Sequence, residues 1–259
     1  DTSRRVIMII GEGGVFILIL MAGFWKIQQS IAKEIQLSQR QNNFMLSVTH
    51  ELKTPLTSIQ LALQTLKKRN LDPEVRENLI AKALNANQRL SSLIDNIINA
   101  SRLESNDFTP RLEIFPLNTF LQSKTEELTI IYEQASITLL CEVDIINADA
   151  YMLETIFNNL LENAIKYSDE NPKIEISVKN KGQMTEITIA DQGAGISAQE
   201  KLQIFKKFYR VGNEISRSQK GSGLGLFITS EFVQLHKGRI KCENNNHKGT
   251  KFIIELPHG

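Results

Sequence analysis

Two stretches of this sequence carry apolar residues at alternating spacings of four and three, and this pattern predicts two helices. The first stretch consists of Leu52, Leu56, Ile59, Leu63 and Leu66, extended backwards by Met45 and Val48. The second stretch consists of Leu79, Ala83, Ala86, Leu90, Leu93, Ile97 and Ala100. Such spacing lines one narrow seam of a helix that packs against other helices. Because residues 67–72 are polar and Pro73 suits the first turn of a helix, we expect an antiparallel hairpin.

One hairpin of this kind leaves apolar surface in contact with water, because Ile94 and Ile98 lie beside the seam. Two hairpins together bury that surface in a four-helix bundle. We therefore expect the chain to form a homodimer through this segment.

His50 is the candidate reactive group of the first helix. It lies two positions from both Val48 and Leu52, which places it roughly 200° around the helix from the seam, so the imidazole is expected to face water. A neutral imidazole is a nitrogen nucleophile, and Glu51 is placed to accept the proton of one ring nitrogen. Thr54, one turn further on, is placed to orient a water molecule at the same site. An incidental surface histidine is the alternative.

An apolar segment from Val6 to Trp25 precedes the hairpin. A helix of this length rises about 30 Å, the thickness of a bilayer core, and Trp25 followed by Lys26 is typical of an interfacial anchor. Glu12 is the exception, because a carboxylate in mid-membrane costs about 2.5 kcal/mol or more. We expect a membrane-spanning helix; a buried core helix and a cleaved signal peptide are the alternatives. Residues 26–41 predict a continuous helix from this segment to the hairpin.

After residue 110 the periodicity changes, and short alternating runs indicate a sheet. Strands are expected at Arg111–Phe115, Ile137–Val143, Ile174–Val178, Glu186–Ala190 and Lys251–Leu256. Helices are expected at Leu117–Gln134, Asp149–Tyr167 and Phe227–His236. The predicted class is α+β, with helices on one face of the sheet.

Asn159 and Asn163 are four residues apart and share one face of a predicted helix. Amide oxygens are hard ligands that suit Mg²⁺, which also bridges to phosphates. Lys166, near the same end of the helix, is placed to neutralise phosphate charge. Solvated surface asparagines are the alternative.

Asp191, Gly193 and Gly195 follow directly after a predicted strand. A carboxylate in this place can accept a hydrogen bond from the exocyclic amine of adenine, and glycines let the backbone approach a base closely. A plain turn after a strand is the alternative.

The run Gly221-Ser222-Gly223-Leu224-Gly225 leads into a predicted helix. Glycine amides at a helix N-terminus form an anion site suited to polyphosphate. Arg210, which ends an aromatic-rich run, is within reach of phosphate. The polar residues 197–220 are expected to form a mobile lid over the nucleotide.

Taken in order, these motifs resemble the H, N, first glycine, F and second glycine boxes of sensor histidine kinases. The resemblance implies that His50 accepts a phosphoryl group, that Glu51 is the general base, and that Thr54 takes part in dephosphorylating the partner. It further implies Mg²⁺ at Asn159 and Asn163, adenine at Asp191, and contacts to ATP from Lys166, Tyr167, Gly193, Gly195, Arg210, Gly221, Gly223, Leu224 and Gly225. The fold it implies for residues 111–259 is the α/β-sandwich ATP-binding domain of the GHKL type.

The resulting organisation is a transmembrane segment at residues 1–28, a helical linker at 29–43, a dimerisation and phosphotransfer domain at 44–104, a second linker at 105–110, and the catalytic domain at 111–259. The expected activity is autophosphorylation of His50 from ATP-Mg²⁺, followed by transfer to an aspartate on a response-regulator receiver domain. An ATP-hydrolysing clamp and a scaffold that acts mainly as a phosphatase are the competing functions.

The same reading predicts a protein of the inner or plasma membrane with its catalytic domains in the cytoplasm, where ATP is available. The formal net charge of +1 indicates no nucleic-acid partner. Cys141 and Cys242 match no metal-ligand or redox spacing.

Overall fold

The computed structural model describes residues 2–68, 71–105, 108–132, 134–168, 171–211, 222–245 and 248–258, and the side chains of the first helix at residue 14 and from residue 17 onward, except residue 40. The chain divides into two compact units, Asp1–Leu46 and Ser47–Gly259. Each unit is described by itself below.

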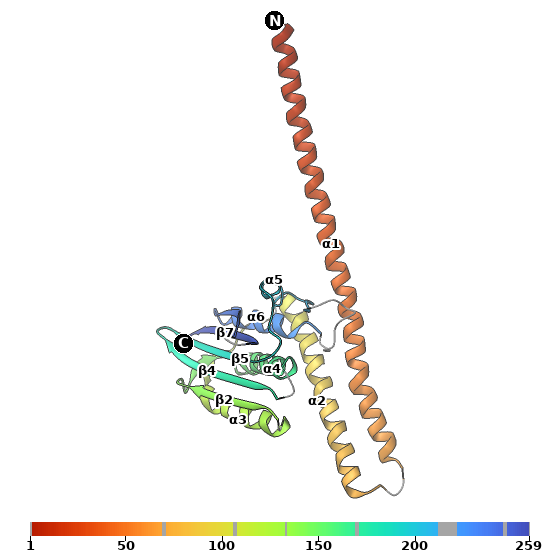
Figure 1. The fold of residues 1–259 in the computed structure, drawn as a ribbon, viewed down its shortest axis with the longest axis vertical. Coiled ribbons are helices and arrows are strands. Elements are labelled where there is room, and N and C mark those ends of the chain that lie inside the picture. The colour runs from red at the N-terminus through yellow and green to blue at the C-terminus, as the bar shows by residue number, and fades with distance from the viewer. Residues whose placement is uncertain are drawn as a thin grey trace. The chain divides into compact units, whose positions relative to one another are not determined.

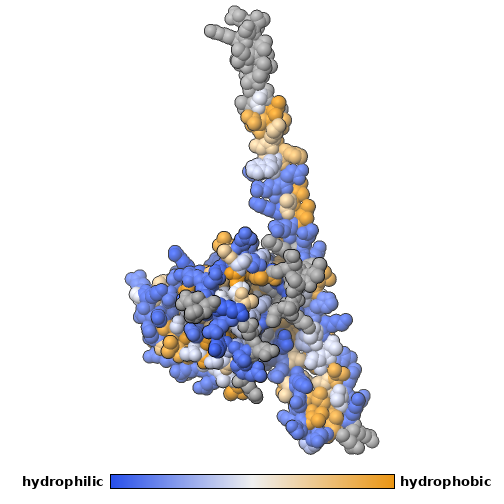
Figure 2. All heavy atoms as spheres, viewed as in Figure 1, coloured by the Kyte–Doolittle hydropathy of each residue, from blue (hydrophilic) through white to orange (hydrophobic). Residues whose placement is uncertain are grey.

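The first unit consists of the N-terminal part of helix α1, which spans Thr2–Leu66 (Figure 1). The helix includes the predicted membrane segment and the predicted helical linker. Seven of its apolar side chains are more than half exposed: Ile17, Leu18, Ile19, Leu20, Met21, Phe24 and Trp25. Figure 2 shows hydrophobic atoms on this part of the helix, next to its grey end. Among the residues that the structure describes, no helix reaches the combination of length and apolar character that a membrane crossing requires.

The second unit begins with a helical hairpin made of the end of α1 and helix α2, Pro73–Glu104. The Asp72 side chain accepts a hydrogen bond from the Glu74 backbone N–H at 3.1 Å, so it caps α2, and Pro73 occupies the first turn as predicted. The hairpin buries Val48 and Ala62 from one helix and Ala86 and Ala100 from the other.

The predicted seam of the first helix is only partly buried within the hairpin. Leu56 and Leu63 are each 58% exposed, so this part of the seam stays in contact with water in a single chain, as expected for one hairpin. Ile94 and Ile98 are also exposed, as predicted.

The rest of this unit is built on a five-stranded sheet with the strand order β2-β4-β5-β7-β6 (Figure 1). The strands are β2 Ser136–Cys141, β4 Lys173–Lys181, β5 Met184–Asp191, β7 Thr250–Pro257 and β6 Arg239–Asn244. Strand β2 is parallel to β4, and the other neighbours are antiparallel. A separate antiparallel pair joins β1 Glu113–Phe115 to β3 Ile146–Ala148.

Helices α3 Leu117–Ile131, α4 Ala150–Lys166 and α6 Gly225–Leu235 pack on this sheet, and the short α5 spans Ala198–Lys201. Burial alternates along β4, where Ile174, Ile176 and Val178 are buried and Lys173 and Glu175 are exposed. This alternation means that one face of the sheet carries the core and the other faces water. The largest buried side chains of α4 and α6 are Phe157 and Phe232.

The predicted strands and helices of this part of the chain are all present, with ends shifted by a few residues. Strand β4 pairs with β5, with Lys181 opposite Met184 across the turn that contains Gly182. Strands β3 and β6 and helix α5 were not predicted. Of the predicted lid, the structure describes residues 197–211, and residues 212–220 lie outside the described part of the chain.

Candidate active site

His50 lies on α1 with its side chain exposed, as the seam geometry predicts. Its neighbours Glu51 and Leu52 are half-buried, and Val48 is buried. The Thr54 hydroxyl donates a hydrogen bond to the His50 carbonyl at 3.0 Å. Pro55, the next residue, has no N–H to give to the Glu51 carbonyl one turn back. The helix therefore presents His50 to solvent beside a locally weakened turn.

Helix α4 begins at a well-connected N-cap, Asp149. One carboxylate oxygen accepts from the Met152 N–H at 3.0 Å, and the other accepts from the Arg111 N–H at 2.8 Å. The Asp149 N–H in turn donates to His236 Nε2 at 3.0 Å. These contacts fix the start of α4, and with it the face that carries the two asparagines.

Asn159 is 8% exposed and its side-chain nitrogen donates to the Gly225 carbonyl at 3.2 Å. This bond connects α4 to the first residue of α6, so the predicted N box and second glycine box lie together. Because the amide nitrogen is engaged, the amide oxygen is the group left for a ligand. Asn163 lies one turn further along α4 and is half-buried.

Asp191 ends β5 and is 4% exposed. One of its oxygens, Oδ1, accepts hydrogen bonds from the backbone N–H groups of Gly193 at 2.8 Å and Thr250 at 3.1 Å. Burial raises the pKa of this carboxyl, and the two hydrogen bonds oppose that rise. A side chain at Gly193 would stand 2.3 Å from the Tyr167 carbonyl, so glycine is required there. The carboxylate is thus held in one orientation, with Oδ2 left to face a ligand.

The second glycine box contacts the aromatic run that lies within the predicted lid. The Phe208 N–H donates to the Gly223 carbonyl at 3.1 Å. Gly223 has a φ of 71°, and a side chain there would stand 2.9 Å from the Tyr209 carbonyl. Leu224 is fully buried, Gly225 begins α6, and Gly195 has a φ of 77°. Gly221 lies outside the described residues.

Charged groups of the hairpin and of the nucleotide domain meet near the end of α4. Burial lowers the pKa of Lys166, the nearby Glu51 carboxylate opposes this shift, and Arg210 adds to it. Burial likewise raises the pKa of Tyr167, with Arg210 opposing. Lys166, Tyr167 and Arg210 therefore share one electrostatic environment with the residue that follows His50.

Three further contacts join the hairpin to the nucleotide domain. Arg210 Nη1 donates to Ser47 Oγ at 3.1 Å, and Lys207 forms an ion pair with Glu104. Both amide atoms of the buried Asn99 lie within hydrogen-bond distance of the Tyr151 hydroxyl, at 2.8 and 3.0 Å. None of the hairpin residues in these contacts was predicted from the sequence.

Asn245 is another residue that sequence reasoning missed. Its side-chain nitrogen donates to the Asp191 carbonyl at 2.9 Å. The only signal available was its place within a run of three asparagines shortly before Gly249, which is typical of a turn. Such a signal does not indicate a partner far away in the sequence.

Within the described part of the chain, no group of three or more His, Cys, Asp and Glu side chains is placed to hold a metal ion. A divalent cation at this site would therefore depend on amide oxygens, such as those of Asn159 and Asn163, and on phosphate oxygens. Hard oxygen donors of this kind fit Mg²⁺.

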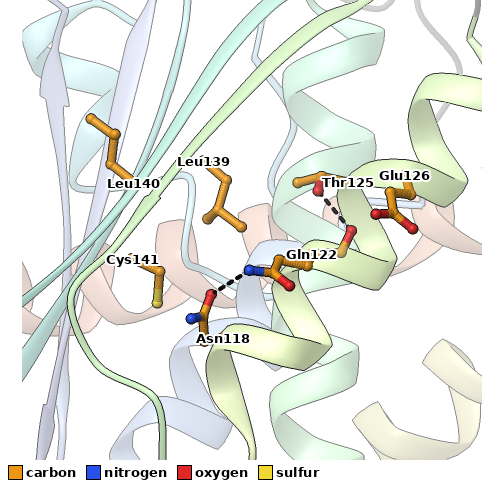
Figure 3. A pocket seen from close by; sticks show the side chains of 7 residues that line it. All are labelled: Asn118, Gln122, Thr125, Glu126, Leu139, Leu140 and Cys141. Atoms are coloured by element: carbon orange, nitrogen blue, oxygen red, sulfur yellow. Dashed lines mark hydrogen bonds between the residues drawn. The ribbon is translucent and has the colours of Figure 1, made fainter.

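A separate pocket lies between α3 and β2 (Figure 3). Its lining consists of Asn118, Gln122, Thr125, Glu126, Leu139, Leu140 and Cys141. Two of its polar side chains bond within α3, since Gln122 donates to Asn118 at 3.2 Å and Thr125 donates to the Gln122 carbonyl at 2.8 Å, and Asn118 donates to Asp144 at 3.1 Å. It shares no residue with the predicted boxes.

Comparison with known proteins gives two family matches. Residues 40–106 match the model described as His Kinase A (phospho-acceptor) domain, and residues 148–259 match the model described as Histidine kinase-, DNA gyrase B-, and HSP90-like ATPase. Both matches contain the predicted boxes, with His50 in the first and the nucleotide residues in the second.

Individual relatives agree with these matches. Sensor protein kinase WalK of Staphylococcus aureus is 28% identical over 248 residues, which cover 92% of this chain and 40% of the relative. The chain thus spans well under half of that protein. The solved structure of Acinetobacter baumannii histidine kinase AdeS is 25% identical, with a TM-score of 0.57, and the match covers 81% of this chain and 98% of that one. Histidine kinase ThkA, solved in complex with response regulator protein TrrA, has the same fold at 24% identity, with a TM-score of 0.58 and coverage of 88% and 66%.

Proposed function

The chain contains the catalytic core of a two-component sensor histidine kinase, and from this we propose that it transfers the γ-phosphoryl group of ATP to His50 and then to an aspartate of a response regulator. The observation that carries the proposal is the exposed His50, whose neighbour Glu51 lies in the electrostatic environment of Lys166 and Arg210. The imidazole is accessible to a nucleotide, and its helix already meets the nucleotide domain.

In the first step, a ring nitrogen of His50 attacks the γ-phosphorus of ATP. The bond from that phosphorus to the bridging oxygen breaks, and ADP leaves with the electron pair. Glu51 takes the proton of the other ring nitrogen, so the imidazole stays neutral as the new bond forms. Catalysis of this kind depends mostly on positioning and charge neutralisation.

The nucleotide domain supplies that positioning. Asp191, with Oδ1 fixed by two backbone donors, accepts a hydrogen bond from the adenine amine through Oδ2. Lys166, Tyr167 and Arg210 contact the ribose and phosphates, and the backbone around Gly193, Gly195, Gly221, Gly223, Leu224 and Gly225 lies along the nucleotide. Asn159 and Asn163 would hold Mg²⁺ through their amide oxygens, and the ion would supply neutralisation of the phosphate charge.

In the second step, an aspartate oxygen of the response regulator attacks the phosphorus, the bond from phosphorus to the His50 nitrogen breaks, and His50 is left as a free imidazole. This step is proposed to occur on the hairpin of a homodimer. The exposed apolar side chains of the hairpin support the dimer, because a second copy would remove them from water: Leu56, Leu63, Leu84, Ile94 and Ile98. Thr54 is proposed to assist the reverse process, in which water removes the phosphoryl group from the response regulator.

We also propose that residues 6–25 anchor the protein in the inner or plasma membrane, with the catalytic domains in the cytoplasm. The apolar composition of this segment and the exposed apolar side chains from residue 17 onward support the proposal. Expression of the chain with and without residues 1–28, followed by separation of membranes, tests it. Recovery of both forms in the soluble fraction would argue against an anchor.

The phosphoryl transfer is tested with γ-³²P-labelled ATP and a His50→Gln variant. We expect no stable label on the variant and unchanged binding of ATP, while His258→Gln, a control at a histidine outside the site, keeps the label. The label should be lost in acid and survive in base, as a nitrogen–phosphorus bond requires. Persistent label on His50→Gln would assign the acceptor elsewhere, and ATP hydrolysis without any label on the wild type would favour a clamp.

A further inference from the structure

The carbonyl group of Asp191 accepts a hydrogen bond from a side chain that lies outside the sheet. The ladder between β5 and β7 ends at the pair Ala190–Lys251, one residue before Asp191. Beyond that point the Asp191 carbonyl accepts a hydrogen bond from the side chain of Asn245 at 2.9 Å. Asn245 follows β6 and is separated from Asp191 by more than fifty residues.

The connection between β6 and β7, which contains Asn245 and Gly249, lies in close contact with Asp191. Gly249 has a φ of 107°, and a side chain there would stand 2.1 Å from the Asp191 carbonyl oxygen. The Asn245 N–H donates to the Gly249 carbonyl at 3.1 Å, which closes the turn between β6 and β7. The next residue, Thr250, donates its N–H to Asp191 Oδ1. The turn therefore holds both the backbone and the side chain of Asp191.

These contacts determine where the second carboxylate oxygen points. The peptide between Asp191 and Gln192 carries the carbonyl held by Asn245, and the N–H of Gly193, two residues after Asp191, holds Oδ1. A rotation of that peptide would move the Gly193 donor and turn the carboxylate. Hydrogen bonds from a ligand to a buried carboxylate depend steeply on such orientation.

We propose that Asn245 is a positioning residue that sets the preference of the site for adenine, acting through Asp191. This inference rests on the proposed binding of ATP at this site. Asn245 need not touch the nucleotide. Its amide fixes the peptide that orients the carboxylate, and the carboxylate recognises the exocyclic amine of the base.

The test compares two nucleotides by calorimetry on the full chain with Mg²⁺: ATP, and purine riboside triphosphate, which lacks the exocyclic amine. The wild type should bind ATP about tenfold to a hundredfold more tightly than the analogue, as expected for a hydrogen bond to a buried carboxylate. Asn245→Ala should weaken ATP binding and leave the affinity for the analogue almost unchanged, so that the ratio falls towards one. Asn245→Asp, which has the same shape but no N–H donor, should behave in the same way.

Asn244→Ala is the matched control, because Asn244 is exposed and ends β6 beside Asn245. It should keep the wild-type ratio. A wild type that binds neither nucleotide would remove the proposed function itself. If the wild type prefers ATP to the analogue and Asn245→Ala keeps the same affinity ratio, the role of Asn245 is overturned and the proposed function is not. Failure of both Asn245 variants to fold, or equal weakening of both nucleotides, would make Asn245 a structural residue of the turn and would equally overturn the proposal.

Discussion

Arg210 Nη1 donates a hydrogen bond to Ser47 Oγ over 3.1 Å, and this bond connects the nucleotide domain to the helical turn that carries His50. The same Arg210 lies close enough to Lys166 and Tyr167 to influence the pKa of each. A residue proposed to contact phosphate is thus also a hydrogen-bond donor to the hairpin. ATP must compete with the hairpin for this guanidinium.

Removal of the Ser47 hydroxyl should therefore strengthen nucleotide binding. For Ser47→Ala we expect the affinity for ATP to rise roughly threefold to tenfold, the range that one hydrogen bond to a charged group accounts for. Calorimetry measures the change, and Ser58→Ala, at an exposed serine of the same helix, serves as the control. An affinity that is unchanged or lower in Ser47→Ala would contradict the competition.

Asn163→Ala should reduce the dependence of ATP binding on Mg²⁺. We expect the affinity for ATP-Mg²⁺ to fall at least about tenfold, which corresponds to about 1.4 kcal/mol. In the absence of Mg²⁺ the variant and the wild type should bind ATP equally. Asn158→Ala is the control, since Asn158 is a half-buried asparagine of the same helix outside the proposed ligand pair. Equal losses in both variants would assign the effect to the helix and not to the metal.

ATP binding should weaken at alkaline pH because of Lys166. Burial lowers the pKa of this lysine below its usual 10.5, so the free protein loses the ammonium charge at a lower pH than an exposed lysine would. The charged form costs folding energy at neutral pH, and this cost disappears as the pH rises through the lowered pKa. Polyphosphate favours the charged form, so the affinity should be constant below that pKa and fall above it.

The measurement is the affinity for ATP between pH 7 and pH 10 in the wild type and in Lys166→Arg. A guanidinium stays charged over this range, so the variant should lose the alkaline decrease. Lys179→Arg, at an exposed lysine of β4, should keep it. The same decrease in Lys166→Arg as in the wild type would assign the titration to another group.

Thr54→Ala should slow the dephosphorylation of a phosphorylated response regulator roughly tenfold or more and leave the autophosphorylation of His50 unchanged. Thr57 offers a matched control, because its hydroxyl makes the same helical bond one turn on, to the Lys53 carbonyl at 2.8 Å, where Thr54 bonds the His50 carbonyl. Thr57→Ala removes that bond without touching the site. If the two variants slow the reaction equally, the effect comes from the helix backbone.

The sequence predicts those parts of the site that are encoded locally. Asn159 and Gly225 belong to separate motifs, and each motif alone predicted a contact with the nucleotide. In the structure, the Asn159 side chain donates a hydrogen bond to the Gly225 carbonyl at 3.2 Å. The exposed side of α1 at His50 follows from helical spacing alone. These predictions succeed because a short helix or turn fixes the relative positions of its own residues.

What the sequence does not predict depends on contacts between distant segments. Ser47 and Arg210 are 163 residues apart and Asn245 and Asp191 are 54 residues apart, so no local pattern indicates either pair. Strand β3 is too short to show a period, and β6 alternates charged residues with only two apolar ones, Ile240 and Cys242. Helical spacing identifies Leu56 and Leu63 as part of an apolar face, but it does not identify the partner that covers them.

The pairing of Asn99 with Tyr151 has a consequence for how the nucleotide domain can slide along α2. Asn99 is 2% exposed in a helix whose other buried residues are alanines, and the Tyr151 hydroxyl is its partner. If the nucleotide domain moved along α2 by one helical turn, the Asn99 amide would lose the Tyr151 hydroxyl and would be buried without a hydrogen-bond partner. Burial of an unpaired amide costs about 1–3 kcal/mol. Positions of the nucleotide domain that are shifted along α2 are therefore higher in free energy than the observed one. The domain is expected to sit in this register or to detach altogether, which makes its motion resemble a switch more than a glide.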